Sequence, residues 1–492
     1  MFSFTYYDIF TKETKNISIV NGLFSDEHLE KRFDFSKWLV SPAFVDAHAH
    51  PIGMVLKYNW VNLYDVSSKR SLLDLIKDFT DLKKPYFIGY NFDESKWRDD
   101  STYPNRKELD DVAKDIPVLL LRIDGHMAVV NTKTIRELHL DGSIMGNLNE
   151  GYIYEENVYV AIEKFVEKFE VPYGYRAIDE FLENGITAVC DMALGGPIPP
   201  GVKDRISRKI EIYYYDTLEK LEKLSMDQVT NILIRYKAKN IGLKLFVDGS
   251  IGARTAYLSE PYRDDPSNRG ILLIEKDLLE ELIKCANKAR IQMAIHAIGD
   301  MAIDNTVNAL RYGNPQLRHR IEHFEMPHDD NIKKISRYRI IPSMQPNFIA
   351  NWQQRGGLYE KRLGWDRAKN MNPLKSILDS TKIIAFGSDC MPVGPLYGIY
   401  GAMTHPIETE RLSLEEAILC YTWGAAYSIF KEKITGKIEP GFEASFIVIN
   451  LKPYDITPEK LKDGKIIALY RKGEQVFTRK SILNPQSPHG SL

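Results

Sequence analysis

Short apolar runs alternate with longer charged, amphipathic stretches along this chain from about residue 185 onward. The apolar runs have the length of buried strands, and stretches such as 276–290 and 302–312 have the spacing of amphipathic helices. This alternation predicts a parallel sheet whose strands are joined by crossover helices. Seven such runs and one more upstream make eight, the number that closes a (β/α)8 barrel. The eight expected strands are residues 43–48, 186–191, 210–215, 242–247, 292–296, 320–323, 340–345 and 383–389.

Two regions do not follow this rhythm. Residues 58–174 separate the first expected strand from the second, which is far too long for a barrel loop, so we expect an inserted subdomain. Residues 1–41 and 436–480 are short β-rich stretches with turn signals, and chain ends often lie close together. We therefore expect a small sheet built from both ends, beside a barrel made of residues 42–57 and 175–435.

Composition narrows the class of protein. Of the 492 residues, 44% are hydrophobic and 27% are charged, which is typical of a globular chain. Lys and Arg total 65 against 67 Asp and Glu, so no basic excess indicates nucleic acid or an anionic membrane as a partner. No apolar run approaches the roughly 18 residues that span a bilayer, and no export signal is visible at the start. We expect a cytoplasmic protein with a small-molecule substrate, and a homodimer from the base rate of oligomers.

Two histidines end the first expected strand, in Asp46-Ala47-His48-Ala49-His50-Pro51. Strand side chains alternate between faces, so His48 and His50 should both point toward the barrel axis, while Val45, Ala47 and Ala49 face the helices. Pro51 ends the strand and places both imidazoles at the carboxyl end, where barrel enzymes keep their active sites. The pair alone is equally consistent with a structural role.

Three more metal-competent side chains end later strands of the expected barrel. They are His296, His323 and Asp389. Four imidazoles and a carboxylate at one edge of a barrel suit a borderline-soft divalent ion such as zinc. Cys390 follows Asp389, so alternation should turn it away from the metals, and we expect it to be inert.

Lys244 lies within the apolar strand 242–247. A buried lysine is costly unless it is paired or neutral. The neutral amine can react with carbon dioxide to give a carbamate that bridges two metals. A lysine that neutralises a carboxylate such as Asp248 is the alternative, and chemistry alone leaves both open.

Several motifs together closely resemble the amidohydrolase superfamily and, within it, the YtcJ-like branch, which includes N-substituted formamide deformylase. The resemblance runs from about residue 41 to 480, with Ala43 and Ser445 standing where the family usually has glycine and aspartate. The matching segments are 44–51, 243–256, 295–304, 320–323 and 387–389, with Arg122-Ile123-Asp124-Gly125-His126 and Asn131 in the insertion and 436–441 near the C-terminus.

The resemblance implies an α/β fold with a TIM-like barrel, a flanking β-sandwich from both chain ends and a metal-dependent hydrolase activity. It favours a carboxylated Lys244 that bridges two divalent ions, expected to be zinc. One metal would be held by His48, His50 and Asp389, and the second by His296 and His323. We expect hydrolysis of an amide or N-acyl C–N bond other than a peptide bond by a metal-bridging hydroxide, with Asp389 as the catalytic proton carrier.

Two alternatives stay open. A one-metal deaminase of the same superfamily would carry a glutamate three residues after the strand-5 histidine, where this chain has Gly299, and it would leave Lys244 without a task. A catalytically inactive scaffold would have lost metal ligands, and this chain keeps all six candidates.

Four further side chains are candidates for substrate contacts. His126 and Trp97 lie in the insertion, which we expect to fold as a lid over the barrel mouth and to select the substrate. Arg254 follows the strand with Lys244 and would bind an anionic group or pair with Asp248 or Glu260. Gln345 ends the seventh strand and would hydrogen-bond the substrate. A structural role is the alternative for His126 and Trp97.

Overall fold

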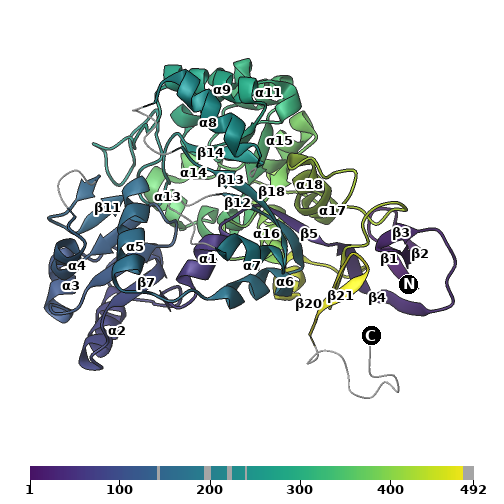
Figure 1. Cartoon of the computed structure of the whole chain (residues 1–492), viewed down its shortest axis with the longest axis horizontal. Helices are drawn as coiled ribbons and strands as arrows, with labels where there is room; N and C mark the ends of the chain where they lie inside the picture. Colours follow the sequence, from purple (N-terminus) through teal and green to yellow (C-terminus); the bar gives the residue numbers. More distant parts are fainter. Residues whose placement is uncertain (141–144, 193–200, 219–223, 239–240, 480–492) are drawn as a thin grey trace.

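Eight parallel strands form a nearly closed barrel at the centre of the molecule (Figure 1). The computed structural model describes residues 1–140, 145–192, 201–218, 224–238 and 241–479. The first and last strands meet where the backbone N–H of Asp389 donates to the carbonyl of His48 at 2.7 Å. All eight expected strands are present, and only the last is much shorter than predicted. In barrel order they are β5 (Phe44–Ala49), β12 (Ile186–Met192), β13 (Glu211–Asp216), β14 (Gly242–Phe246), β15 (Gln292–Ala297), β16 (Arg320–His323), β17 (Ile341–Met344) and β18 (Ala385–Phe386).

Amphipathic helices cover the outside of this barrel. In α9 (Lys276–Ala289), Leu279, Leu282, Ile283 and Ala286 follow helical spacing and are buried in the main hydrophobic core. The second expected helix begins at Asp300 as α10 (Asp300–Ala309). Within the described ranges no helix is long and apolar enough to cross a membrane. The other covering helices include α8 (Met226–Tyr236), α11 (Asp329–Tyr338), α15 (Leu374–Thr381) and α16 (Pro395–Met403).

The inserted segment carries a six-stranded sheet of its own. Side chains of β8 (Val118–Arg122) and β9 (Met127–Val130) alternate between two buried clusters, so the sheet is packed on both faces. The helices α2 (Lys69–Asp81) and α5 (Glu156–Lys168) cover these faces. Figure 1 shows this part on the far side of the barrel from the sheet of the chain ends. The remaining strands are β6 (Val61–Asn62), β7 (Phe87–Phe92), β10 (Gly146–Asn147) and β11 (Tyr152–Tyr154).

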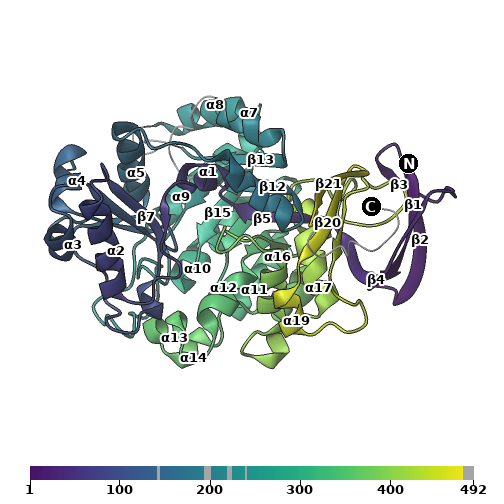
Figure 2. The ribbon, with the colours of Figure 1, turned by 90° about the horizontal axis from the view of Figure 1, so that it is seen from below.

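Both chain ends meet in one seven-stranded sheet (Figure 2). The resemblance implied a flanking β-sandwich from both chain ends. The observed strands form one continuously hydrogen-bonded sheet, because β4 (Arg32–Pro42) pairs with both β1 and β19. Phe4 and Phe446 stack at 4.5 Å between ring centroids, so the sheet curves around an aromatic core. The predicted C-terminal boundary of this sheet, residue 480, lies outside the described ranges. The strands are β1 (Phe2–Asp8), β2 (Glu13–Val20), β3 (Leu23–Ser25), β4, β19 (Phe446–Ile449), β20 (Ile466–Arg471) and β21 (Glu474–Thr478).

Candidate functional site

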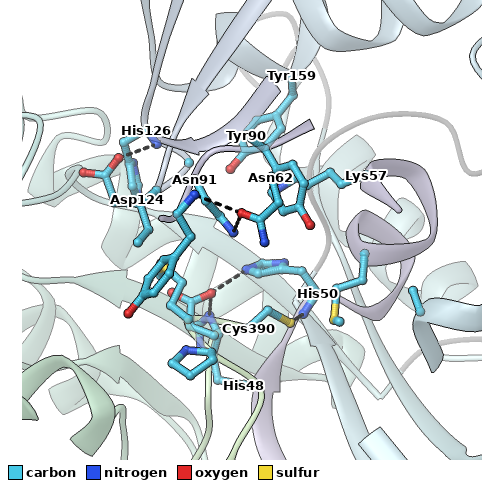
Figure 3. Close-up of a pocket in the computed structure, with 18 of the residues that line it drawn as sticks. His48, His50, Lys57, Asn62, Tyr90, Asn91, Asp124, His126, Tyr159 and Cys390 are labelled. Carbon is cyan, nitrogen blue, oxygen red and sulfur yellow. Dashed lines mark hydrogen bonds and ion pairs between the residues drawn. The ribbon is translucent and has the colours of Figure 1, made fainter. Parts of the chain in front are cut away.

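A cavity of about 290 Å³ lies where the carboxyl ends of the barrel strands meet the inserted sheet (Figure 3). Its lining includes residues of both parts of the molecule. The predicted metal ligands all reach it, although they come from five different strands or the turns that follow them. These six residues are His48, His50, Lys244, His296, His323 and Asp389.

The ring of His48 is held by a buried carboxylate. Its Nδ1–H donates to Oε2 of Glu322 at 2.7 Å, which leaves the lone pair on Nε2 facing the cavity. Arg320 holds that carboxylate in turn with two hydrogen bonds of 2.8 and 2.9 Å. Arg320 and Glu322 belong to the motif segment 320–323, but no functional role was predicted for either residue from the sequence. Two opposite charges two residues apart on a buried strand were the signal that could have found them.

The strict alternation predicted for the first strand is wrong. Val45 and Ala47 do not face the helices, because they pack in the barrel interior with Ala188 and with Ala294 of the opposite strand. The pairing of β5 with β12 changes register twice, and such an irregularity lets neighbouring side chains share a face. His48 and His50 nevertheless both line the cavity, as expected.

Asp389 lies between the two histidines of the first strand. Its Oδ1 is 3.0 Å from Nε2 of His50 and 3.8 Å from Nε2 of His48. Burial alone would raise the pKa of the Asp389 carboxyl, but chiefly the hydrogen bond from His50 holds it below its ordinary value. One ligand atom from each of His48, His323 and Asp389 lies within 4.8 Å of the others. This spacing is compatible with a shared divalent ion, and the three donors come from both of the ligand groups that the resemblance implies.

Left-handed backbone conformations place two of the ligands. His323 has a φ of 73° at the end of β16, and Asp389 has a φ of 52° beyond β18. Cys390 follows with a φ of 58°, so the prediction that alternation turns it away is wrong. Its thiol lines the cavity and accepts a hydrogen bond from the backbone of His50 at 3.2 Å. Burial raises the pKa of this thiol well above its ordinary value, which favours the unreactive protonated form.

His296 lies beside His323, with 4.4 Å between ring centroids. Its Nε2–H donates to the carbonyl of Gly249 at 3.1 Å, so the lone pair is on Nδ1. A backbone carbonyl therefore fixes the tautomer of this ring, as Glu322 does for His48.

Lys244 is 1% exposed, and burial lowers the pKa of its amine to about 8, against the opposing charges of Glu322 and Asp389. Asp248, the alternative partner, instead accepts backbone hydrogen bonds from Tyr257, Ile298 and Gly299. No ion pair joins Lys244 to Asp248 among the described residues. The neutral amine that carbamate formation needs is therefore accessible near neutral pH.

The donor set fits a divalent metal. Burial lowers the pKa of His48, His50, His296 and His323, so all four rings are neutral and can each offer a lone pair. Nδ1 of His50 and Nδ1 of His323 are buried with no hydrogen-bond partner in the described part of the chain. Imidazole nitrogen with a carboxylate is the ligand mixture that suits zinc and its neighbours.

Of the four predicted substrate contacts, only His126 reaches the cavity. Its Nδ1–H donates to Glu155 at 2.7 Å, and its ring centroid is 5.1 Å from that of His296. Burial would lower the pKa of His126, but Glu155 and Asp124 raise it to about 9. The inserted sheet thus presents a cationic ring beside the candidate metal ligands.

The other three are placed elsewhere. Trp97 packs against Phe92 in the core of the insertion and is 7% exposed. Arg254 pairs with Asp264 at 2.9 Å, not with Asp248 or Glu260. The side chain of Gln345 is buried and donates to the carbonyl of Ser343 at 3.4 Å. None of the three belongs to the described lining of the cavity, so the structure does not support their predicted contacts.

A buried charge network joins the insertion to the barrel. Glu94 accepts hydrogen bonds from Arg122 at 3.0 and 3.1 Å and from Arg362 at 2.7 Å. Arg122 also donates to Asp124 at 2.6 Å, and Asp124 accepts from Ser250 in the loop after β14 at 2.5 Å. The motif segments 122–126 and 243–256 therefore meet at one junction, which holds the inserted sheet over the cavity.

Sequence reasoning missed several cavity residues. Lys57 ends the short helix α1 (Pro51–Lys57), and Asn62, Asn91 and Tyr159 come from the insertion. None of these residues belongs to a recognised motif. The signal that could have identified them is their position shortly after the histidine pair or within an aromatic-rich segment.

Comparison with known proteins agrees with this geometry. Residues 38–477 match the model of the amidohydrolase family. "Putative amidohydrolase YtcJ" of Bacillus subtilis (strain 168) is 28% identical over 94% of both chains. N-substituted formamide deformylase of Arthrobacter pascens is 21% identical over 91% of this chain and 90% of its own. The crystal structure of an uncharacterized metal-dependent hydrolase from Pyrococcus horikoshii OT3 superposes with a TM-score of 0.70 at 25% identity, over 93% of this chain and 99% of that one. The chain therefore belongs to the amidohydrolase family and is consistent with its YtcJ-like branch.

Proposed function

We propose that this amidohydrolase cleaves an amide or N-acyl C–N bond of a small molecule, other than a peptide bond, with two divalent metal ions, expected to be zinc. The observation that carries the proposal is the convergence of six metal-competent side chains on one cavity, with four neutral imidazoles and an ionised carboxylate. The similarity to a formamide deformylase supports a C–N bond as the target.

The residues divide into two ligand groups. His48, His50 and Asp389 would hold one ion, and His296 and His323 the second, with carboxylated Lys244 between them. When bound, such ions lower the pKa of water to about 7 and polarise a carbonyl group. The neutral tautomers that Glu322 and Gly249 fix are the forms these ligand roles require.

Asp389 carries the proton in this proposal. Its Oδ1 lies 3.0 Å from His50 Nε2, and its lowered pKa keeps it ionised and able to accept a proton from attacking water. The same oxygen then delivers that proton to the leaving nitrogen. His126 is a cation at neutral pH and can orient a carbonyl or anionic group of the substrate from the lid side.

The deaminase alternative has less support in this geometry. The position that would carry its glutamate is Gly299, whose backbone donates to Asp248 at 2.8 Å, and Lys244 lines the cavity. The inactive scaffold is disfavoured because every predicted ligand reaches the same cavity.

Metal analysis with a substrate screen tests the proposal. We expect about two ions per chain, and metal-dependent hydrolysis of at least one N-acyl, N-formyl or cyclic amide. One ion per chain with ammonia release from a ring would support the deaminase instead. Absence of tightly bound metal would support the scaffold.

A further inference from the structure

Lys57 lines the cavity, and its ammonium is not part of the ligand set. No carboxylate lies within 4.0 Å of it in the described part of the chain. Burial lowers the pKa of Lys57, and the charge of Asp389 only partly opposes this. A half-buried cation without a counter-ion loses hydration that nothing in the protein replaces. A bound anion would replace it.

The wall beside Lys57 offers hydrogen-bond donors. Oδ1 of Asn62 already accepts from the backbone of Tyr64 at 3.1 Å and from Asn91 at 3.3 Å, so its Nδ2 is the group left for a ligand. Burial raises the pKa of Tyr90, which keeps its hydroxyl protonated and able to donate. In the view of Figure 3, Lys57, Asn62 and Tyr90 lie along one side of the cavity, above His50.

Two carboxylates in the lining oppose an anion at this wall. Asp389 belongs to the proposed ligand set, where a bound cation would offset its charge. Glu180 has an exposed side chain, and burial of its carboxyl group raises its pKa, which favours the neutral form. Asp124 is already engaged by Arg122 and Ser250, and Glu155 by His126. The unpaired charge on the wall is therefore that of Lys57.

We infer that the cavity takes an amide whose non-reacting end carries a carboxylate, with Lys57 as its counter-ion and Asn62 and Tyr90 as hydrogen-bond donors. This inference rests on the proposed function, since it names the substrate class for the same site. A cavity of about 290 Å³ has room for a small molecule. The carboxylate can belong to the amine part, as in an N-acylglycine, or to the acyl part, as in the monoamide of a dicarboxylic acid.

Matched substrates test the inference. The charge of Lys57 is removed by Lys57→Met, which keeps the length of the stem, and is restored by Lys57→Arg. Each carboxylate substrate is compared with its carboxamide, once with the charge on the amine part and once on the acyl part. We expect Lys57→Met to lower kcat/KM for the preferred carboxylate substrate by about 10–100-fold, the range of a charged hydrogen bond, and to change the carboxamide by less than about twofold. Lys369→Met, which removes a surface ammonium paired with Asp366, is the matched control and should change neither.

A binding measurement separates failure of the inference from failure of the proposed function. 4-Oxopentanoate has the shape of N-acetylglycine with a CH2 group in place of the amide NH, and hexane-2,5-dione is its neutral counterpart. Neither contains a C–N bond, so calorimetry gives their affinities without turnover. We expect 4-oxopentanoate to bind the metal-loaded enzyme more tightly than the dione, and Lys57→Met to abolish the difference. If no amide is hydrolysed but this difference holds, the proposed reaction is wrong and the anion site stands. Equal effects of Lys57→Met on charged and neutral ligands would overturn the inference.

Discussion

Nδ1 of His48 lies 2.7 Å from Oε2 of Glu322, so a strand on one side of the barrel orients a ring on a strand that is not its neighbour. Arg320 holds the same carboxylate and also donates to the carbonyl of Ala47 at 2.6 Å. The network is fully buried, so it fixes the ring with little freedom. The direction of the His48 lone pair is thus set before any metal arrives.

Glu322→Gln tests this orientation. The amide keeps the shape, but it loses the charge that balances Arg320 and strengthens the bond to His48. We expect metal affinity to fall by about 10–100-fold, the usual effect of losing a partner of a metal-bound histidine. Competition with a chelator of known affinity measures it. Ser343→Ala removes the acceptor of a 2.8 Å hydrogen bond from Arg320 and does not change His48. An equal loss of metal affinity in that variant would mean that the effect is a general weakening of the network.

The Asp389→Asn variant separates the proposed role of Asp389 as a metal ligand from its role as a proton carrier. The amide can still coordinate weakly, but it cannot accept the proton. We expect kcat to fall at least ~10²-fold while the metal content changes little. Cys390→Ser is the control, because the hydroxyl can keep the hydrogen bond from the His50 backbone, and it should retain near-normal turnover. Near-normal turnover in Asp389→Asn would remove this residue from the mechanism.

Lys244→Ala and Lys244→Arg test the carbamate. We expect both to lose metal and activity together, because neither can form the bridging anion. Added short-chain carboxylic acids should restore part of the metal content and rate of the Ala variant and none of the Arg variant. Full activity in Lys244→Arg would show that only a positive charge is required at this position.

The barrel could be predicted because its strands are short apolar runs with strong helical stretches between them. The run 242–247, for example, coincides with β14 to within one residue. The run 383–389 was overpredicted, because the backbone turns left-handed at Asp389 after a strand of only two residues. Propensity does not encode such a turn, and neither does it encode the register change in β5.

The candidate metal ligands could be predicted because the carboxyl ends of the strands in a parallel barrel lie at one edge. The direction in which a single side chain points outside such a pattern could not be predicted. Arg254 has a φ of 60° and turns to Asp264, ten residues further along the chain. Trp97 is of a residue type that often lines pockets, but it is buried in the core of the insertion. The proposed roles of Lys57 and Glu322 depend on their neighbours in space, which are the cavity and His48. The spacing of residues along the chain does not predict these neighbours.

Glu94→Gln tests the junction that holds the insertion over the cavity. Glu94 is fully buried and balances two guanidinium groups, so its neutralisation leaves charge uncompensated. We expect destabilisation of roughly 3–5 kcal/mol, the range for breaking a buried pair, seen as a lower melting temperature and faster proteolysis within the insertion. Glu137→Gln, which removes partly exposed ion pairs with Lys133 and Lys168, should have a negligible effect. An unchanged melting temperature for Glu94→Gln would mean that apolar packing alone holds the insertion against the barrel.

His126 and Trp97 now give opposite expectations for the proposed lid. His126 faces the cavity as a cation held by Glu155, whereas Trp97 packs in the core of the insertion. His126→Gln removes the charge at the cavity and keeps a polar side chain, so it should change kcat/KM unequally between substrates while metal content stays the same. Trp97→Phe should lower stability through lost packing volume and leave the ratio of kcat/KM between substrates unchanged. Measuring several amides with both variants checks this. If His126→Gln lowers every rate by one common factor, the inserted sheet is only a support, and selectivity must come from the loops of the barrel.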